Sequence, residues 1–163
     1  MSYPPPVYHG ERGEMSARLV PADTPPTIDG LPRSTCTYLA TGASTGGKFG
    51  LYRWDFGPAV SGPDPHFHRT LAESFFVLDG VVSIHDGTGW HDRHPGDFVY
   101  VPEGGVHGFK NRSGAPASML LLFAPGAPRE EYFETLAALA REGRSLPPDE
   151  YREFMERHDN TWV

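Results

Sequence analysis

The chain has 163 residues and a formal net charge of −7, with 14 Lys and Arg residues against 21 Asp and Glu residues. This acidic balance, without a cluster of basic residues, argues against binding to a nucleic-acid backbone. The single cysteine excludes an intrachain disulfide. The N-terminal segment has no apolar signal-peptide core, and no apolar stretch of the chain is long enough to span a membrane. We therefore expect a soluble, cytoplasmic protein with one core of its own.

Glycine and proline are frequent, at 19 and 17 residues, and they divide the chain into short segments. We expect a flexible arm over residues 1–15 and then two short strands, Ser16–Val20 and Thr35–Ala40. Strand-like segments and turn signals alternate from there to residue 124, which is typical of an antiparallel all-β sandwich or barrel. These segments are 48–56, 66–79, 81–93 (a hairpin around 86–89), 96–102, 106–113 and 117–124.

The pattern changes to helix after residue 125. Proline and acidic residues mark two helix starts, so we expect one helix between Pro128 and Gly143 and another over 147–158. Each has one apolar face and is expected to cap the barrel or pad a dimer contact. The predicted organisation is an arm (1–15), a barrel (16–126) and a C-terminal helical extension (127–163).

Two histidines lie at a spacing that suits metal binding. His66 and His68 are two residues apart, which places both imidazoles on one face of a strand, about 6–7 Å apart. This spacing is weak evidence alone, because most histidines on strands are exposed or hydrogen-bonded. His107 follows a tight glycine turn at Gly104–Gly105 and begins another strand. The remaining histidines lie in the arm, around the hairpin or at a helix end, and we expect them not to be ligands: His9, His85, His91, His94 and His158.

Glu73 opens a strongly apolar strand, where burying a carboxylate without a partner is expensive. Its odd offset from His68 allows it to join the histidines only if residues 69–72 turn the chain. A cation is the simplest partner, and a salt bridge to Arg53 or Arg69 is the alternative.

Two segments together resemble the cupin motifs. The first has the histidine pair, then four residues, Glu73, six residues and Gly80. The second runs from Gly96 to Asn111 and has Pro102, Gly104 and His107 at the remaining fixed positions of the family pattern. The loop between Gly62 and His66 is shorter than in the family. The resemblance covers residues 62–111 closely and implies a double-stranded β-helix, or jelly-roll barrel, with N-terminal extension strands and two short C-terminal helices.

The resemblance also implies that His66, His68, Glu73 and His107 bind one divalent transition-metal ion directly. This ligand set suits Fe, Ni, Mn, Co or Zn. The leading hypothesis is a quercetin dioxygenase-like oxygenase acting on a small aromatic or enolisable substrate, with Glu73 also a catalytic proton acceptor. One alternative is a non-oxidative isomerase, cyclase, lyase or decarboxylase in which the metal is only a Lewis acid. Another is a metal-dependent small-molecule binder, or a barrel with a closed structural zinc.

Strand parity predicts which side chains face this site. Residues sharing inward parity should line a pocket for a small planar substrate, or else pack as ordinary core. The expected substrate-binding residues are Tyr52, Trp54, Phe75, Tyr100 and Phe109, with Tyr100 and Asn111 also possible hydrogen-bond donors to the metal ligands. No membrane partner is expected, and the detached N-terminal strands predict a homodimer.

Overall fold

Alternating burial along the strands explains why this sequence closes into a barrel. In β3 every second side chain is buried, including Tyr52, Trp54 and Phe56, and the intervening residues are only partly covered. Such a two-residue period places one face of a strand in the core and the other outside. The computed structural model describes residues 2–163. The strands are β1 (Ile28–Leu31), β2 (Ser34–Ala40), β3 (Gly50–Phe56), β4 (His66–Phe67), β5 (Ala72–Asp79), β6 (Val82–His85), β7 (Trp90–Arg93), β8 (Phe98–Val101), β9 (Gly108–Lys110), β10 (Ala117–Ala124) and β11 (Thr161–Trp162).

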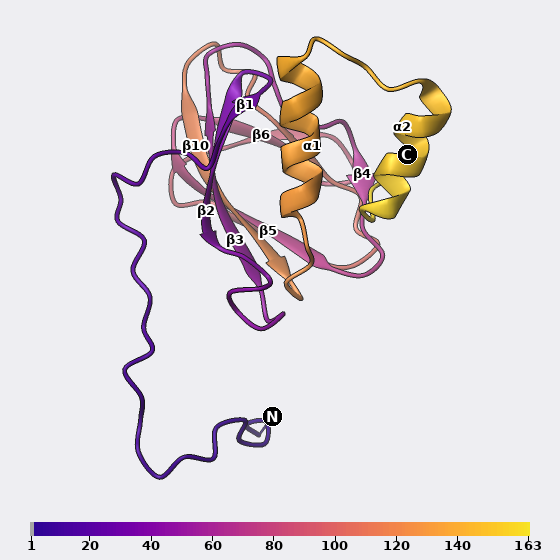
Figure 1. Cartoon of the computed structure of the whole chain (residues 1–163). Coiled ribbons are helices and arrows are strands. Elements are labelled where there is room, and N and C mark those ends of the chain that lie inside the picture. Colours follow the sequence, from indigo (N-terminus) through magenta and orange to yellow (C-terminus); the bar gives the residue numbers. More distant parts are fainter. Residues whose placement is uncertain (1) are drawn as a thin grey trace.

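Two antiparallel sheets enclose the core (Figure 1). The larger sheet has the strand order β1-β2-β3-β10-β5-β8, and the smaller one has the order β7-β6-β9. A short pair, β11-β4, lies beside them. Met119 and Leu121 from the larger sheet and Ile84 and Phe109 from the smaller one belong to one buried cluster. The predicted all-β barrel is therefore confirmed.

The two helices cover the barrel as predicted. α1 (Glu130–Arg141) packs against β1, and α2 (Pro148–Arg157) contributes side chains to the buried core cluster. Tyr132, Phe133, Phe154 and Met155 form their buried faces. In the described part of the chain neither helix is long and apolar enough to cross a membrane.

The predicted strand at Ser16–Val20 is wrong. Residues 2–27 contain no helix or strand, and Figure 1 shows this segment running away from the barrel. Its apolar side chains, such as Leu19, remain exposed. A strand needs a neighbour to satisfy its backbone groups, and the segment has none among residues 2–163. The first strand of the sheet is β1, which pairs with β2.

The outer face of β5 and β8 is the surface on which we expect the predicted homodimer. It exposes four large apolar side chains, Phe76, Leu78, Phe98 and Tyr100, and Phe98 is 63% exposed at the edge of the larger sheet. Phe98→Glu is expected to convert a dimer into monomers, because a charge would be buried at the contact. Size-exclusion chromatography with light scattering measures this. Wild-type protein that is monomeric at every concentration would contradict the dimer.

Candidate metal centre

The four predicted ligands come together from three separate places in the chain. His66 lies in β4 and His68 just after it, Glu73 is the second residue of β5, and His107 immediately precedes β9. The backbones of His66 and His107 are bridged by two reciprocal hydrogen bonds of 2.8 Å. This bridge brings a residue of the first motif against one of the second.

Gly104 fixes the approach to His107. Its φ of +79° is a left-handed conformation that glycine adopts without strain. Its backbone N–H donates to the carbonyl of His68 at 2.7 Å. The glycine turn therefore joins the two histidine segments through the backbone, before any side chain is considered.

The turn that Glu73 requires is present between β4 and β5. The Asp159 carboxylate accepts hydrogen bonds from the backbone N–H groups of Arg69 and Thr70 and from the Thr70 hydroxyl, at 2.7–3.0 Å. These contacts hold the chain in a bend, so β5 leaves in a different sheet from β4. The bend explains how a residue at an odd offset from His68 faces the same centre.

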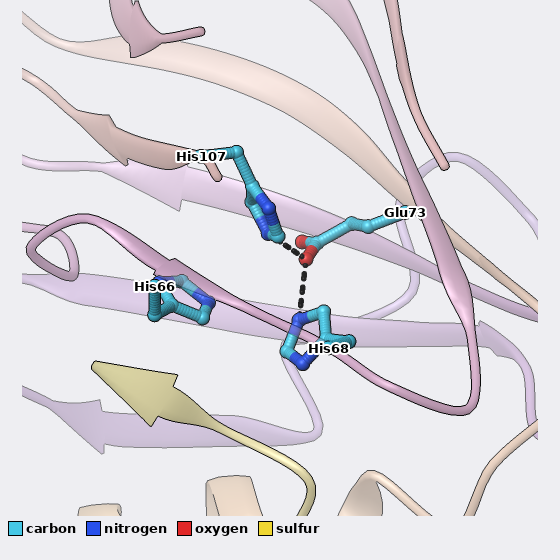
Figure 2. Close-up of side chains that lie close together, drawn as sticks. All are labelled: His66, His68, Glu73 and His107. Atoms are coloured by element: carbon cyan, nitrogen blue, oxygen red, sulfur yellow. Dashed lines mark hydrogen bonds and ion pairs between the residues drawn. The ribbon is translucent and has the colours of Figure 1, made fainter. Parts of the chain in front are cut away.

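The side chains converge closely (Figure 2). Glu73 Oε2 lies 3.0 Å from His68 Nε2 and 2.8 Å from His107 Nε2. One donor atom from each of the four residues lies within 4.8 Å of the other three. All four residues are at most 4% exposed. Three imidazoles and one carboxylate therefore form a single buried cluster.

The outer ring nitrogens determine which atoms face the centre. The Nδ1 atoms of His66, His68 and His107 each lie within hydrogen-bond distance of a backbone carbonyl, those of Asp64, Asp159 and Gly105. A carbonyl accepts only, so Nδ1 carries the proton, and a neutral ring then has a lone pair on Nε2. Lone pairs aimed at a carboxylate repel it unless a proton or a cation lies between them. The donor set thus fits a metal ion, with the carbonyls orienting its ligands.

The charges of the cluster are strongly coupled. Burial acts to raise the pKa of Glu73, but His107 and His68 outweigh it and hold that pKa well below the usual value. Burial acts to lower the pKa of His107, and Glu73 outweighs it and raises that pKa. Burial, together with His107, lowers the pKa of His66 to about 4. An anionic carboxylate and a neutral His66 at neutral pH are the forms that a metal requires.

The alternative salt bridges of Glu73 do not form. Arg53 pairs with Asp55 at 3.0 Å, and the Arg69 guanidinium lies over the Phe67 ring, 5.0 Å from its centroid. Among the described residues the only ion-pair partners of Glu73 are His68 and His107.

A cavity of about 470 Å³ adjoins the cluster, and both His66 and Glu73 line it. Of the predicted substrate-binding residues, Trp54 and Phe109 line this cavity. Tyr52 and Phe75 are fully buried and are absent from its wall. Both pack as core, Tyr52 against Phe123 and Phe75 against Phe109.

The prediction for Tyr100 is wrong. This residue is 59% exposed on the outer face of β8, because its neighbours Val99 and Val101 point inward against the core. Asn111 does not contact the ligands either. It is fully buried, and its side-chain amide donates to the carbonyls of Gly57 and Ala115, which ties two loops together.

The C-terminal segment supplies site residues that sequence reasoning missed. β11 pairs with β4, so Trp162 lies opposite His66, with ring centroids 5.3 Å apart. Asp159 orients His68 through its carbonyl, and Arg129 donates to the carbonyl of His158. The only local signal in the sequence was Trp162, an aromatic residue after the last helix, and its presence does not indicate which part of the chain it contacts.

Asp159→Asn is expected to destabilise the protein by about 1–2 kcal/mol, because the carboxylate caps the bend through several charge-assisted hydrogen bonds. Burial acts to raise the pKa of Asp159, but hydrogen bonds from Thr70 and Arg69 outweigh it and lower that pKa. The lowered pKa of Asp159 stabilises the folded protein at pH values above the ordinary pKa of an aspartate. This stabilisation is lost as the pH falls through the lowered pKa. The difference between variant and wild type in chemical denaturation should therefore disappear in acid. A difference that grows on acidification would contradict this role.

Comparison with known proteins identifies the barrel. Residues 52–123 match the family model described as the cupin domain. The chain has the cupin fold over these residues. The match includes all four residues of the cluster, and the cupin fold predicted from the two motifs is confirmed. No curated protein sequence matches the chain significantly.

Solved structures share the cupin fold at low sequence identity. KdgF from Halomonas sp. has a TM-score of 0.55 at 18% identity, covering 63% of this chain and 87% of its own. The polyketide cyclase RemF from Streptomyces resistomycificus has a TM-score of 0.56 at 22% identity, covering 68% and 80%. A predicted oxalate decarboxylase from Thermotoga maritima has a TM-score of 0.53 at 19% identity, covering 56% and 80%. Likeness at this level establishes the fold and leaves the reaction open.

Proposed function

We propose that this cupin is a metal-dependent enzyme acting on a small organic substrate. His66, His68, Glu73 and His107 would hold one divalent transition-metal ion, and the adjoining cavity would hold the substrate. The observation that carries the proposal is the convergence of four buried donor atoms within 4.8 Å at the wall of a cavity of about 470 Å³. A cavity of this size suits a small organic ligand.

Four protein ligands leave the site open if the ion takes six ligands, and closed if it is a tetrahedral zinc. Three neutral imidazoles and one carboxylate leave a divalent ion with a net charge near +1, and a six-coordinate ion would keep two further positions. Bound there, an ion would supply Lewis-acid chemistry or, if redox-active, oxygen chemistry. Because His66 and Glu73 line the cavity, a substrate in it would lie beside those positions.

Within this proposal, the favoured reaction is oxygenation of the quercetin dioxygenase-like kind. The aromatic side chains of Trp54, Phe109 and Trp162 line the cavity and suit a planar aromatic or enolisable substrate. An apolar wall also excludes water from the reacting group. Glu73 would act as a ligand and as proton acceptor.

A non-oxidative reaction is the second candidate. Both close contacts of Glu73 with the histidine Nε2 atoms use Oε2, which leaves Oε1 to accept a proton from a substrate. Proton transfer at such a carboxylate, with the ion only as Lewis acid, would serve an isomerase, cyclase, lyase or decarboxylase.

Oxygen uptake distinguishes the two candidates. The Fe- and Ni-loaded protein is mixed with a flavonol or a β-diketone in an oxygen electrode, with metal-free protein as the control. The oxygenase predicts uptake that depends on both metal and substrate. Turnover of the same substrates under strict anaerobiosis would refute the oxygenase and support the second candidate. A metal-loaded protein that binds these compounds without converting them would contradict an enzymatic role for them.

A further inference from the structure

Arg129 is a buried cation without a carboxylate partner. It lies at the start of α1 and is only 4% exposed. Its Nη1 donates to the carbonyl of His158, and its Nη2 donates to Asn160 Oδ1 at 3.2 Å. Among residues 2–163 it forms no ion pair, whereas the more exposed Arg53 and Arg144 each pair with an acid.

The surroundings of Arg129 compensate its charge only partly. The guanidinium lies over the rings of Tyr132 and Phe123, 4.5 and 5.1 Å from their centroids. Such cation–π contacts contribute less than the cost of burying a charge, which proteins normally offset with an opposite charge. Two acids lie near enough to act on the guanidinium, and both are engaged: Glu73 with the histidines and Asp159 with the bend after β4.

Arg129 lines the same cavity as His66 and Glu73. Its buried Nε–H has no acceptor among the described residues. The same holds for the indole N–H groups of two further lining residues, Trp54 and Trp162. Three residues of the cavity wall thus each hold one unpaired buried donor, and one of the three is positively charged. Unpaired buried donors are rare in native proteins and mark a place for an acceptor.

We propose that the cavity binds an organic anion whose carboxylate or enolate oxygens are held by Arg129, while its apolar, planar body lies among the aromatic side chains. The planar guanidinium matches the two oxygens of a carboxylate, and the indole N–H groups would serve further oxygens. The location beside the metal rests on the proposed function, but the recognition of an anion by Arg129 does not require the ion.

A matched pair of ligands tests the proposal. 2-Naphthoate and the neutral 2-naphthamide have the same ring body, and their dissociation constants are measured by calorimetry on the full chain. Each titration is run on metal-free protein and again after loading with Zn²⁺. The wild type should prefer the anion roughly tenfold or more in both forms, the size expected for a charge-assisted hydrogen bond. A wild type with no preference, or with no binding of either compound, would overturn the proposal.

Variants separate recognition from a purely structural role. Arg129→Met should abolish the preference, and Arg129→Lys, which keeps the charge, should retain part of it. The control Arg144→Met removes the same charge from an exposed arginine and should leave the ratio unchanged. If Arg129 only holds the C-terminal segment, Arg129→Met would weaken both ligands equally and leave the ratio intact. Should Arg129→Met fail to fold, a reduced preference in a folded Arg129→Lys together with an unchanged amide affinity would support the proposal, and equal weakening of both ligands would overturn it.

The outcome is independent of the metal. A protein that shows the preference but holds no ion would refute the proposed function and leave the anion site standing. A protein that holds the ion but shows no preference for the anion would refute the anion site and leave the proposed function standing.

Discussion

His107→Ala is expected to abolish tight binding of a divalent transition-metal ion. The imidazole of His107 contributes one of the four donor atoms and approaches Glu73 Oε2 at 2.8 Å. Losing a residue that merely orients a metal-binding histidine costs roughly 10–100-fold in affinity, so losing a ligand should cost about a hundredfold or more. Metal content after dialysis and competition with a chromophoric chelator measure the effect.

His94→Ala is the matched control for this variant. His94 is exposed in the turn before β8 and lies outside the cluster, so the substitution removes an imidazole without touching the site. Its metal content should equal that of the wild type. Unchanged occupancy in His107→Ala, or an equal loss in both variants, would show that the ligand assignment is wrong.

Phe75→Ala is expected to lower the free energy of unfolding by about 3–5 kcal/mol, the usual cost of removing a buried phenylalanine. The side chain is fully buried, with its ring centroid 5.6 Å from that of Phe109 and 5.9 Å from that of His107. Deleting it would leave a cavity under the second motif. Chemical denaturation of the metal-free protein measures the change.

The next residue provides the control. Phe76 points to the opposite face of β5 and is 39% exposed, so Phe76→Ala should cost about 1 kcal/mol or less. Equal effects of the two substitutions would contradict the alternation on which the barrel rests. If the Phe75→Ala protein had wild-type stability but altered ligand binding, Phe75 would instead be a substrate-binding residue, as strand parity predicted.

The sequence was most informative where the chemistry is local. The histidine pair, Glu73 and the glycine turn before His107 lie in two short motifs, and the resemblance of these motifs to those of cupins implied both the jelly-roll barrel and the cluster. The bend at residues 69–72 could be predicted from the odd offset between His68 and Glu73 alone. Its cause could not be inferred, because the Asp159 carboxylate that holds it lies about ninety positions further along the chain.

Residues outside the motifs were less predictable because their environment depends on tertiary contacts. Tyr100 lies between two inward-facing valines, and the side of the sheet on which its side chain lies is set by how β8 pairs with β5. The predicted strand at Ser16–Val20 had a suitable pattern but no neighbour to pair with. In the sequence, Arg129 resembles any residue at the start of a helix. Its burial depends on the positions of α1 and β11 beside the cavity, which only the structure shows.

Diffraction data from the metal-loaded protein, collected at the absorption edge of the ion, test the central claim most directly. We expect one anomalous peak per chain, about 2.0–2.3 Å from the Nε2 atoms of His66, His68 and His107 and from a carboxylate oxygen of Glu73. A peak bound elsewhere, or an ordered cluster without a peak in protein that carries stoichiometric metal, would contradict the account.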